Sequence, residues 1–154
     1  MGRFRRDARG ASAVEFALVC APFFVLVLYT LQLGIYYMTQ TALDAGVIRT
    51  ADDLRNSFNY AATPVFPTAD ALKATVAANA GGLITATDSS LTVEIRPMAT
   101  FSGTVVPITG GVADYGDGRS VLVLRAQSSV IALAPGFSNL TKVTAISLLR
   151  RQGR

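Results

Sequence analysis

Gly10 and Glu15 stand out chemically, because they lie at the start of a long apolar run. Residues 16–38 are 23 amino acids without a charged side chain, long enough for a membrane-spanning helix. Glu15 is thus a carboxylate at the edge of a membrane segment, where charges are costly and usually functional. One helical turn downstream stand Leu18 and Val19, which cannot neutralise it. We therefore expect the Glu15 carboxylate to need a positively charged partner that does not come from the next helical turn.

A cut after Gly10 would create such a partner. It would leave a free α-amino group on Ala11 and make Glu15 the fifth residue of the new chain. Pairing of the amine and the carboxylate, within one chain or between neighbouring subunits, would lower the desolvation cost of both. In the alternative interpretation, Glu15 is an interfacial carboxylate that snorkels to lipid headgroups, and Gly10 belongs to a plain linker.

The apolar run is predicted to be a single transmembrane anchor with its N-terminus in the cytoplasm. Positive residues favour the cytoplasmic side, and the arginines that precede the run are Arg3, Arg5, Arg6 and Arg9. We therefore expect a bacterial inner-membrane protein whose C-terminal part is periplasmic. A cleaved secretory signal is the alternative, but its apolar core would be only about 7–15 residues long.

Composition argues against several kinds of active site. The chain has no histidine, which is the commonest general base and metal ligand. It has a single cysteine, Cys20, which cannot form a disulfide within the chain. We predict no enzyme activity, no cofactor and no metal site. Asp114 and Asp117 lie in a glycine-rich turn and are too few for a calcium loop, so turn chemistry explains them. The net charge of +4 is concentrated at the two termini, so we also predict no nucleic-acid binding.

Two helices are predicted. Apolar residues continue at helical spacing beyond the membrane run, so the anchor should extend to about Asn59. A second helix is expected over residues 69–80, with Thr68 as its N-cap and Gly81 and Gly82 as its stop.

The helix extension carries several small residues on the periplasmic side of the anchor. Ala42, Ala45 and Gly46 would let another helix approach closely. An ordinary amphipathic helix packed on the sheet of its own chain explains the same pattern, and both interpretations remain open at this stage.

The C-terminal part is predicted to be a small antiparallel sheet. Alternating residues indicate a half-buried strand over 91–96, and longer strands are expected over 120–133 and 140–150. A further strand is expected over 101–108. Helices followed by strands indicate an α+β fold. The expected organisation is a cytoplasmic leader (1–10), a transmembrane helix (11–38), a helix extension (39–62) and an extracytoplasmic α+β domain (63–154).

The basic leader, Gly10, the residues ASAV, Glu15 and the long apolar helix together resemble the processing signal of type IV prepilins. The sequence RGASAVEFAL and the pair Glu15-Phe16 are most similar to the tight-adherence (Tad/Flp) branch of this family. Two residues depart from the family pattern: Phe16 replaces a tyrosine, and Ala11 replaces a common phenylalanine. The length resembles that of TadE-like minor pseudopilins. The resemblance covers residues 3 to about 55.

This resemblance implies a structural role and a set of partners. A prepilin peptidase would cut between Gly10 and Ala11, and Glu15 would guide assembly. The other expected partners are pilins or pseudopilins, through the N-terminal helix, and inner-membrane lipid. The implied fold is type IV pilin-like and the implied function is assembly of a Tad/Flp pilus or a related secretion machine. The alternative is an unprocessed, membrane-tethered periplasmic binding or scaffold domain.

Overall fold

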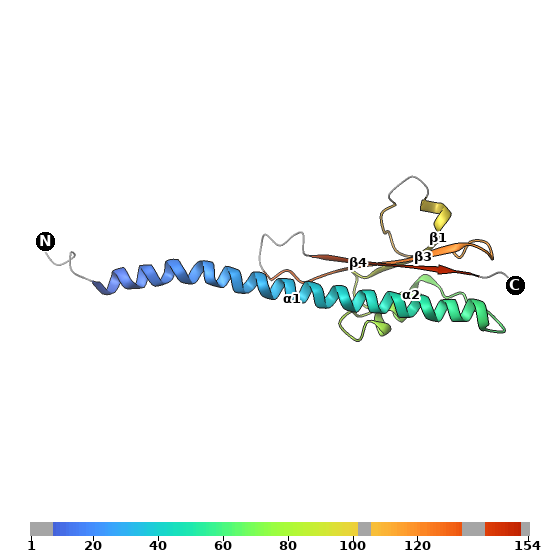
Figure 1. Cartoon of the computed structure of the whole chain (residues 1–154), viewed down its shortest axis with the longest axis horizontal. Helices are drawn as coiled ribbons and strands as arrows, with labels where there is room; N and C mark the ends of the chain where they lie inside the picture. The colour runs from blue at the N-terminus through green and yellow to red at the C-terminus, as the bar shows by residue number, and fades with distance from the viewer. Residues whose placement is uncertain (1–7, 102–105, 134–140, 152–154) are drawn as a thin grey trace.

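A computed structural model describes residues 8–101, 106–133 and 141–151 of the chain. Its longest element is a continuous helix of 53 residues, which runs through Pro22 without a break. The N-terminal part of this helix projects away from the rest of the molecule, and the C-terminal part lies along a small domain (Figure 1). The elements are, in chain order, α1 (Ala8–Tyr60), α2 (Ala69–Asn79), β1 (Thr92–Pro97), η1 (Met98–Phe101), β2 (Val112–Ala113), β3 (Val121–Ser129) and β4 (Lys142–Arg150).

The predicted α+β, pilin-like order is confirmed, but the sheet is mixed rather than antiparallel. Its strand order is β2-β1-β3-β4. β3 pairs antiparallel with both β1 and β4, as expected. β2 runs parallel to β1, with Glu94 opposite Val112. After β1, the chain therefore returns toward the end at which β1 begins before it forms β2, instead of turning directly into an antiparallel hairpin.

The strand expected over 101–108 is wrong. Residues 98–101 form the 3-10 helix η1, residues 106–110 have no strand structure, and 102–105 lie outside the described residues. The backbone carbonyls of Val106 and Pro107 accept hydrogen bonds from the side chain of Arg125 instead of from a strand. Pro107 also lacks the N–H that a central strand would need.

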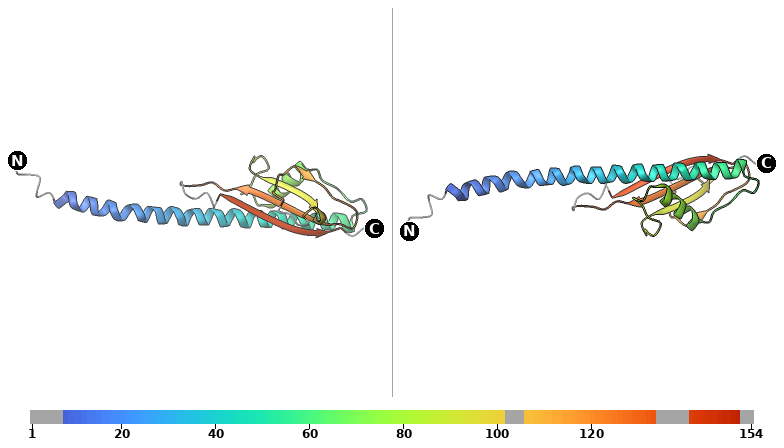
Figure 2. Two further views of the ribbon diagram at one scale, coloured as in Figure 1. Left: turned by 90° about the horizontal axis from the view of Figure 1, so that it is seen from above. Right: turned by 90° about the horizontal axis from the view of Figure 1, so that it is seen from below.

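The core lies between the sheet and the two helices. α1 contributes Leu43, Val47 and Leu54, which are almost fully buried. They meet the sheet residues Ile95 and Leu124, which are completely buried. Two further views show the C-terminal half of α1 running along the sheet (Figure 2). Among the described residues, it is this half of α1 whose apolar face is buried by other elements of the chain.

The boundaries of α2 are set as the sequence predicts. The hydroxyl of Thr68 accepts a hydrogen bond from the Ala71 N–H at 3.3 Å and caps the first turn. After the helix, Gly81 and Gly82 take positive φ angles of 70° and 84°, which are strained for residues with a side chain.

The last turn of α1 is held by an aromatic cluster. Phe58 stacks on Phe66 with ring centroids 5.3 Å apart, and Tyr115 meets both rings edge-on. The phenol of Tyr115 donates a hydrogen bond to the Pro67 carbonyl. Burial raises the pKa of Tyr115 to about 12, so the phenol stays protonated and remains a donor over the physiological pH range. The cluster ties the loop before α2 to the turn before β3.

At Gly46, α1 and α2 approach each other closely. A Cβ atom at Gly46 would lie 2.7 Å from the Val76 carbonyl oxygen and 3.2 Å from the Ala80 Cβ. The helix that approaches this small residue is therefore α2 of the same chain. Ala42 and Ala45 instead line an open apolar groove with Leu83.

Gly46→Ala is expected to lower the free energy of unfolding by about 1–3 kcal/mol, because the new methyl group forces α2 away from α1. Gly34→Ala is the matched control in the same helix. Nothing lies within 4 Å of its added Cβ. The free energies of unfolding of the two variants are compared by urea unfolding of the full chain in detergent micelles, with protease resistance as the readout. Equal stability of both variants would contradict the tight α1–α2 contact.

Candidate functional site

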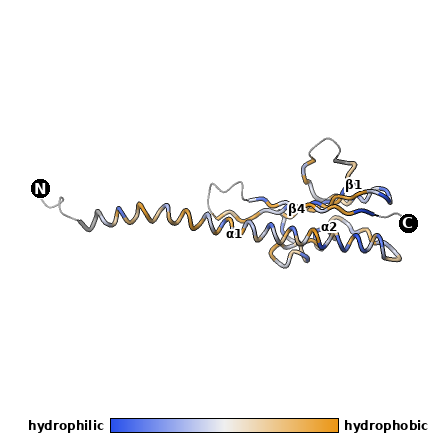
Figure 3. The backbone as a smooth tube through the Cα atoms, viewed as in Figure 1, coloured by the Kyte–Doolittle hydropathy of each residue, from blue (hydrophilic) through white to orange (hydrophobic). Residues whose placement is uncertain are grey.

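The N-terminal part of α1 is a bare apolar helix. None of residues 12–31 is buried, and Phe16, Leu18, Val19 and Phe24 each expose more than half of their side chain. Hydropathy colouring shows the apolar character of this part of α1 (Figure 3). Among the described residues, α1 is the one helix long and apolar enough to cross a membrane. Within the part of the chain that the structure describes, no element buries this surface, so it is available to lipid or to other helices.

The predicted processing and assembly residues lie on this bare helix. Arg9, Gly10 and Ala11 are in the first turns of α1, and Glu15 and Phe16 follow as exposed neighbours. Glu15 is followed at its own helical face by Leu18 and Val19, both exposed and apolar. Glu15 is therefore accessible to a positive group of another molecule. The leader residues Arg3, Arg5 and Arg6 lie outside the described residues.

Two polar side chains within the apolar run have hydrogen-bond partners inside the chain. The hydroxyl of Thr30 donates to the carbonyl of Leu26 at 2.9 Å, which satisfies it within the helix. Gln32 is completely buried. Its Nε2 donates to the Ile131 carbonyl at 3.2 Å, and its Oε1 accepts from the Leu133 N–H at 2.9 Å. The sequence shows Gln32 as polar, but not that it binds the segment after β3.

Further along, α1 holds the outer edge of the sheet. The Gln40 Nε2 donates to the Thr144 carbonyl at 2.9 Å, and an Arg55 amino group donates to the Leu148 carbonyl at 3.3 Å. Both carbonyls lie on β4, the last strand of the sheet order. These contacts cover part of an edge that could otherwise pair with another chain. With the Gln32 contacts, they fix the domain to α1 at three levels.

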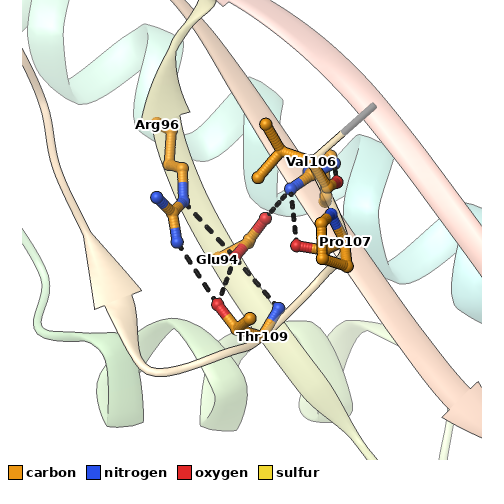
Figure 4. Close-up of polar contacts among 6 residues, drawn as sticks. Glu94, Arg96, Val106, Pro107 and Thr109 are labelled. Atoms are coloured by element: carbon orange, nitrogen blue, oxygen red, sulfur yellow. Dashed lines mark hydrogen bonds and ion pairs between the residues drawn. The ribbon is translucent and has the colours of Figure 1, made fainter. Parts of the chain in front are cut away.

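A buried ion pair that sequence reasoning missed lies on the other face of the sheet. Glu94 is completely buried and pairs with Arg125, which stands directly opposite on β3. Arg96, also on β1, places its Nε 3.4 Å from the second carboxylate oxygen of Glu94. Thr109 donates to that same oxygen through its backbone N–H and its hydroxyl, each at 3.4 Å (Figure 4). The sequence shows the charged residues of the two strands, but not that they pair across the sheet.

This cluster has the properties of a structural clamp. One Arg125 amino group donates to the Val106 carbonyl at 2.7 Å, and the other reaches the Pro107 carbonyl at 3.4 Å. The guanidinium therefore holds the irregular segment before β2 against the sheet. Its two amino groups are directed at the carboxylate and carbonyls of its own chain, so the cluster stabilises the domain instead of presenting a charge to a ligand.

Comparison with known proteins gives a family match that lies on the N-terminal helix. The family described as TadE-like protein matches residues 10–52. The match begins at Gly10 and includes Glu15, the bare helix, Gln32 and most of the part of α1 that packs on the domain. Searches of curated proteins and of solved structures find no match. The resemblance to TadE-like proteins of Tad pilus systems that the sequence predicts is confirmed over these residues.

Proposed function

We propose that this chain, which is TadE-like over residues 10–52, is a pseudopilin that assembles into a Tad/Flp pilus or related secretion machine through its bare N-terminal helix. The observation that carries the proposal is the contrast between the two halves of α1. None of residues 12–31 is buried by the described part of the chain, whereas the C-terminal half is built into the domain. Such a helix can lie in lipid before assembly and against other pilin helices afterwards.

Processing after Gly10 prepares this helix for assembly. A prepilin peptidase on the cytoplasmic side removes the basic leader, and the new amine on Ala11 comes to lie four residues before Glu15. The positive and negative groups then stand at the same membrane edge. Glu15 of one subunit pairs with the amine of its own or a neighbouring chain, which lowers the cost of keeping both charges at low dielectric.

The proposed topology follows the charge of the leader. Arg3, Arg5, Arg6 and Arg9 keep the N-terminus in the cytoplasm, and residues 11–38 cross the bacterial inner membrane. The helix extension (39–62) and the α+β domain (63–154) lie in the periplasm. In this arrangement the chain is a structural component and not an enzyme.

Gly10→Leu is expected to block processing, because a bulky side chain does not fit a peptidase site shaped for glycine. The test is N-terminal sequencing of chain isolated from cells that express the prepilin peptidase. The wild type should begin at Ala11, and Gly10→Leu should keep its leader. Ala13→Leu, which lies beyond the cut, is the control and should be processed normally. A Gly10→Leu chain that is shortened like the wild type would contradict the proposal, and a wild type that keeps its leader would favour the unprocessed tethered domain.

A further inference from the structure

The segment directly after β3, with Ile131 and Leu133, is called the hairpin end here, and it is attached to the apolar helix at Gln32. The two hydrogen bonds of this side chain hold the backbone of Ile131 and Leu133 against α1. The Val130 N–H donates to the Thr141 carbonyl at 2.7 Å and pairs the two sides of the hairpin just above this point. The height of the hairpin end along α1 is therefore fixed by specific contacts and not by loose packing.

That height lies within the reach of the bilayer. Gln32 lies sixteen positions after Phe16, which corresponds to about 24 Å of helix, whereas the hydrocarbon core is about 30 Å thick. With Glu15 at the cytoplasmic edge, Gln32 lies inside the opposite leaflet. Moving the helix outward until Gln32 reached water would draw Glu15 into hydrocarbon, which is costly.

The hairpin end has the side chains that a lipid environment favours. Ile131 exposes 77% and Leu133 exposes 41% of the side chain, although both follow the well-packed strand β3. No charged residue occurs in the sequence between Arg125 and Lys142. On the neighbouring helix, Tyr37 and Met38 are also exposed, as in an interfacial belt.

Two backbone groups at this level are paired inside the protein, as a membrane environment requires. Irregular backbone is tolerated at bilayer depth only where its polar groups are paired inside the protein. Gln32 supplies a donor to the Ile131 carbonyl and an acceptor to the Leu133 N–H. This explains why a completely buried glutamine occurs within an apolar helix.

We propose that the hairpin end at Ile131 and Leu133 is a second membrane contact, which inserts into the lipid leaflet on the side of the domain. The occupant of this apolar surface is lipid, because the surface continues that of the membrane-spanning helix. Two attachments, the helix and the hairpin, fix how the domain is rotated relative to the bilayer before assembly. The inference rests on the proposed membrane insertion of α1.

The test uses tryptophan as a depth probe, since the chain contains none. Three single variants of the full chain are reconstituted in phosphatidylethanolamine–phosphatidylglycerol vesicles with brominated acyl chains. Ile131→Trp probes the hairpin end, Phe24→Trp probes the spanning helix, and Tyr60→Trp probes the far end of α1, where the side chain is 78% exposed. Phe24→Trp and Ile131→Trp should both be strongly quenched and blue-shifted, and Tyr60→Trp should not.

The outcomes separate this inference from the proposed insertion. Quenching of Phe24→Trp without quenching of Ile131→Trp would overturn the second contact and leave the spanning helix intact. Absence of quenching in Phe24→Trp would overturn both. Gln32→Leu, added to Ile131→Trp, should weaken the quenching because it removes both hydrogen bonds that fix the hairpin. Unchanged quenching would contradict the positioning role of Gln32.

Discussion

A Glu15→Gln chain should be cleaved after Gly10 and inserted in the membrane like the wild type, yet it should no longer copurify with pilus components. The amide keeps the size and hydrogen bonding of the side chain but removes its charge. The amine of Ala11 then has no carboxylate at its own depth, which costs on the order of several kcal/mol at low dielectric. Lateral docking of subunits loses that contribution. Copurification at matched expression, with N-terminal sequencing of the isolated chain, measures both parts.

A second substitution tests whether charge at that depth is what matters. Ser12 lies about one helical turn before Glu15, on the same bare helix. Adding Ser12→Glu to Glu15→Gln returns a carboxylate near the new amine, so copurification should recover in part. Undiminished copurification of Glu15→Gln alone would leave Glu15 as a passive interfacial residue and would favour the tethered-domain function.

Glu94→Ala should destabilise the domain by about 3–5 kcal/mol, because it leaves the charge of Arg125 buried without its partner. Glu94 is completely buried, and the exposed fraction of Arg125 is only 8%. The segment held by Arg125, at Val106 and Pro107, should also loosen. Urea unfolding of the full chain in detergent micelles, read by pulse proteolysis, gives the loss of free energy.

Two controls show whether burial of the pair is the cause. Replacing both partners, Glu94→Leu with Arg125→Leu, removes the most buried charge and leaves only Arg96, whose side chain is 21% exposed, so much of the loss should be recovered. Asp52→Ala removes an exposed ion pair with Arg55, whose atoms are 3.0 Å apart. A surface pair of this kind contributes about 0–1 kcal/mol. A Glu94→Ala effect as small as that of Asp52→Ala would mean that water reaches the cluster.

Elements with local signals could be predicted from the sequence. The long helix follows from its periodicity, and the start and stop of α2 follow from Thr68 and Gly81, whose roles depend only on neighbouring residues. β1 and β4 were expected within two residues of their observed bounds, and β3 lies within its longer expected range. Their alternating side chains reflect one buried face, which is also a local property.

Features that depend on distant residues could not be predicted. The parallel pairing of β2 requires the chain to cross back beside β1, which no local pattern specifies. The bond between Gln32 and Ile131 joins residues 99 positions apart. The pairing of Glu94 with Arg125 depends on the register of β1 and β3. The sequence shows the types of these residues but not their partners, because the partners are set by tertiary packing.

The most direct test of the assembly role is lateral crosslinking from the bare helix of the processed chain. A photoreactive residue at Phe24, which exposes 58% of its side chain, reports what lies against α1 within the membrane. In cells that produce the pilus machinery, we expect the wild type to crosslink to other pilin-like subunits. The same probe in Glu15→Gln should give only lipid adducts. A wild type that crosslinks to lipid alone, or equal subunit crosslinks in both chains, would contradict assembly through this helix and its carboxylate.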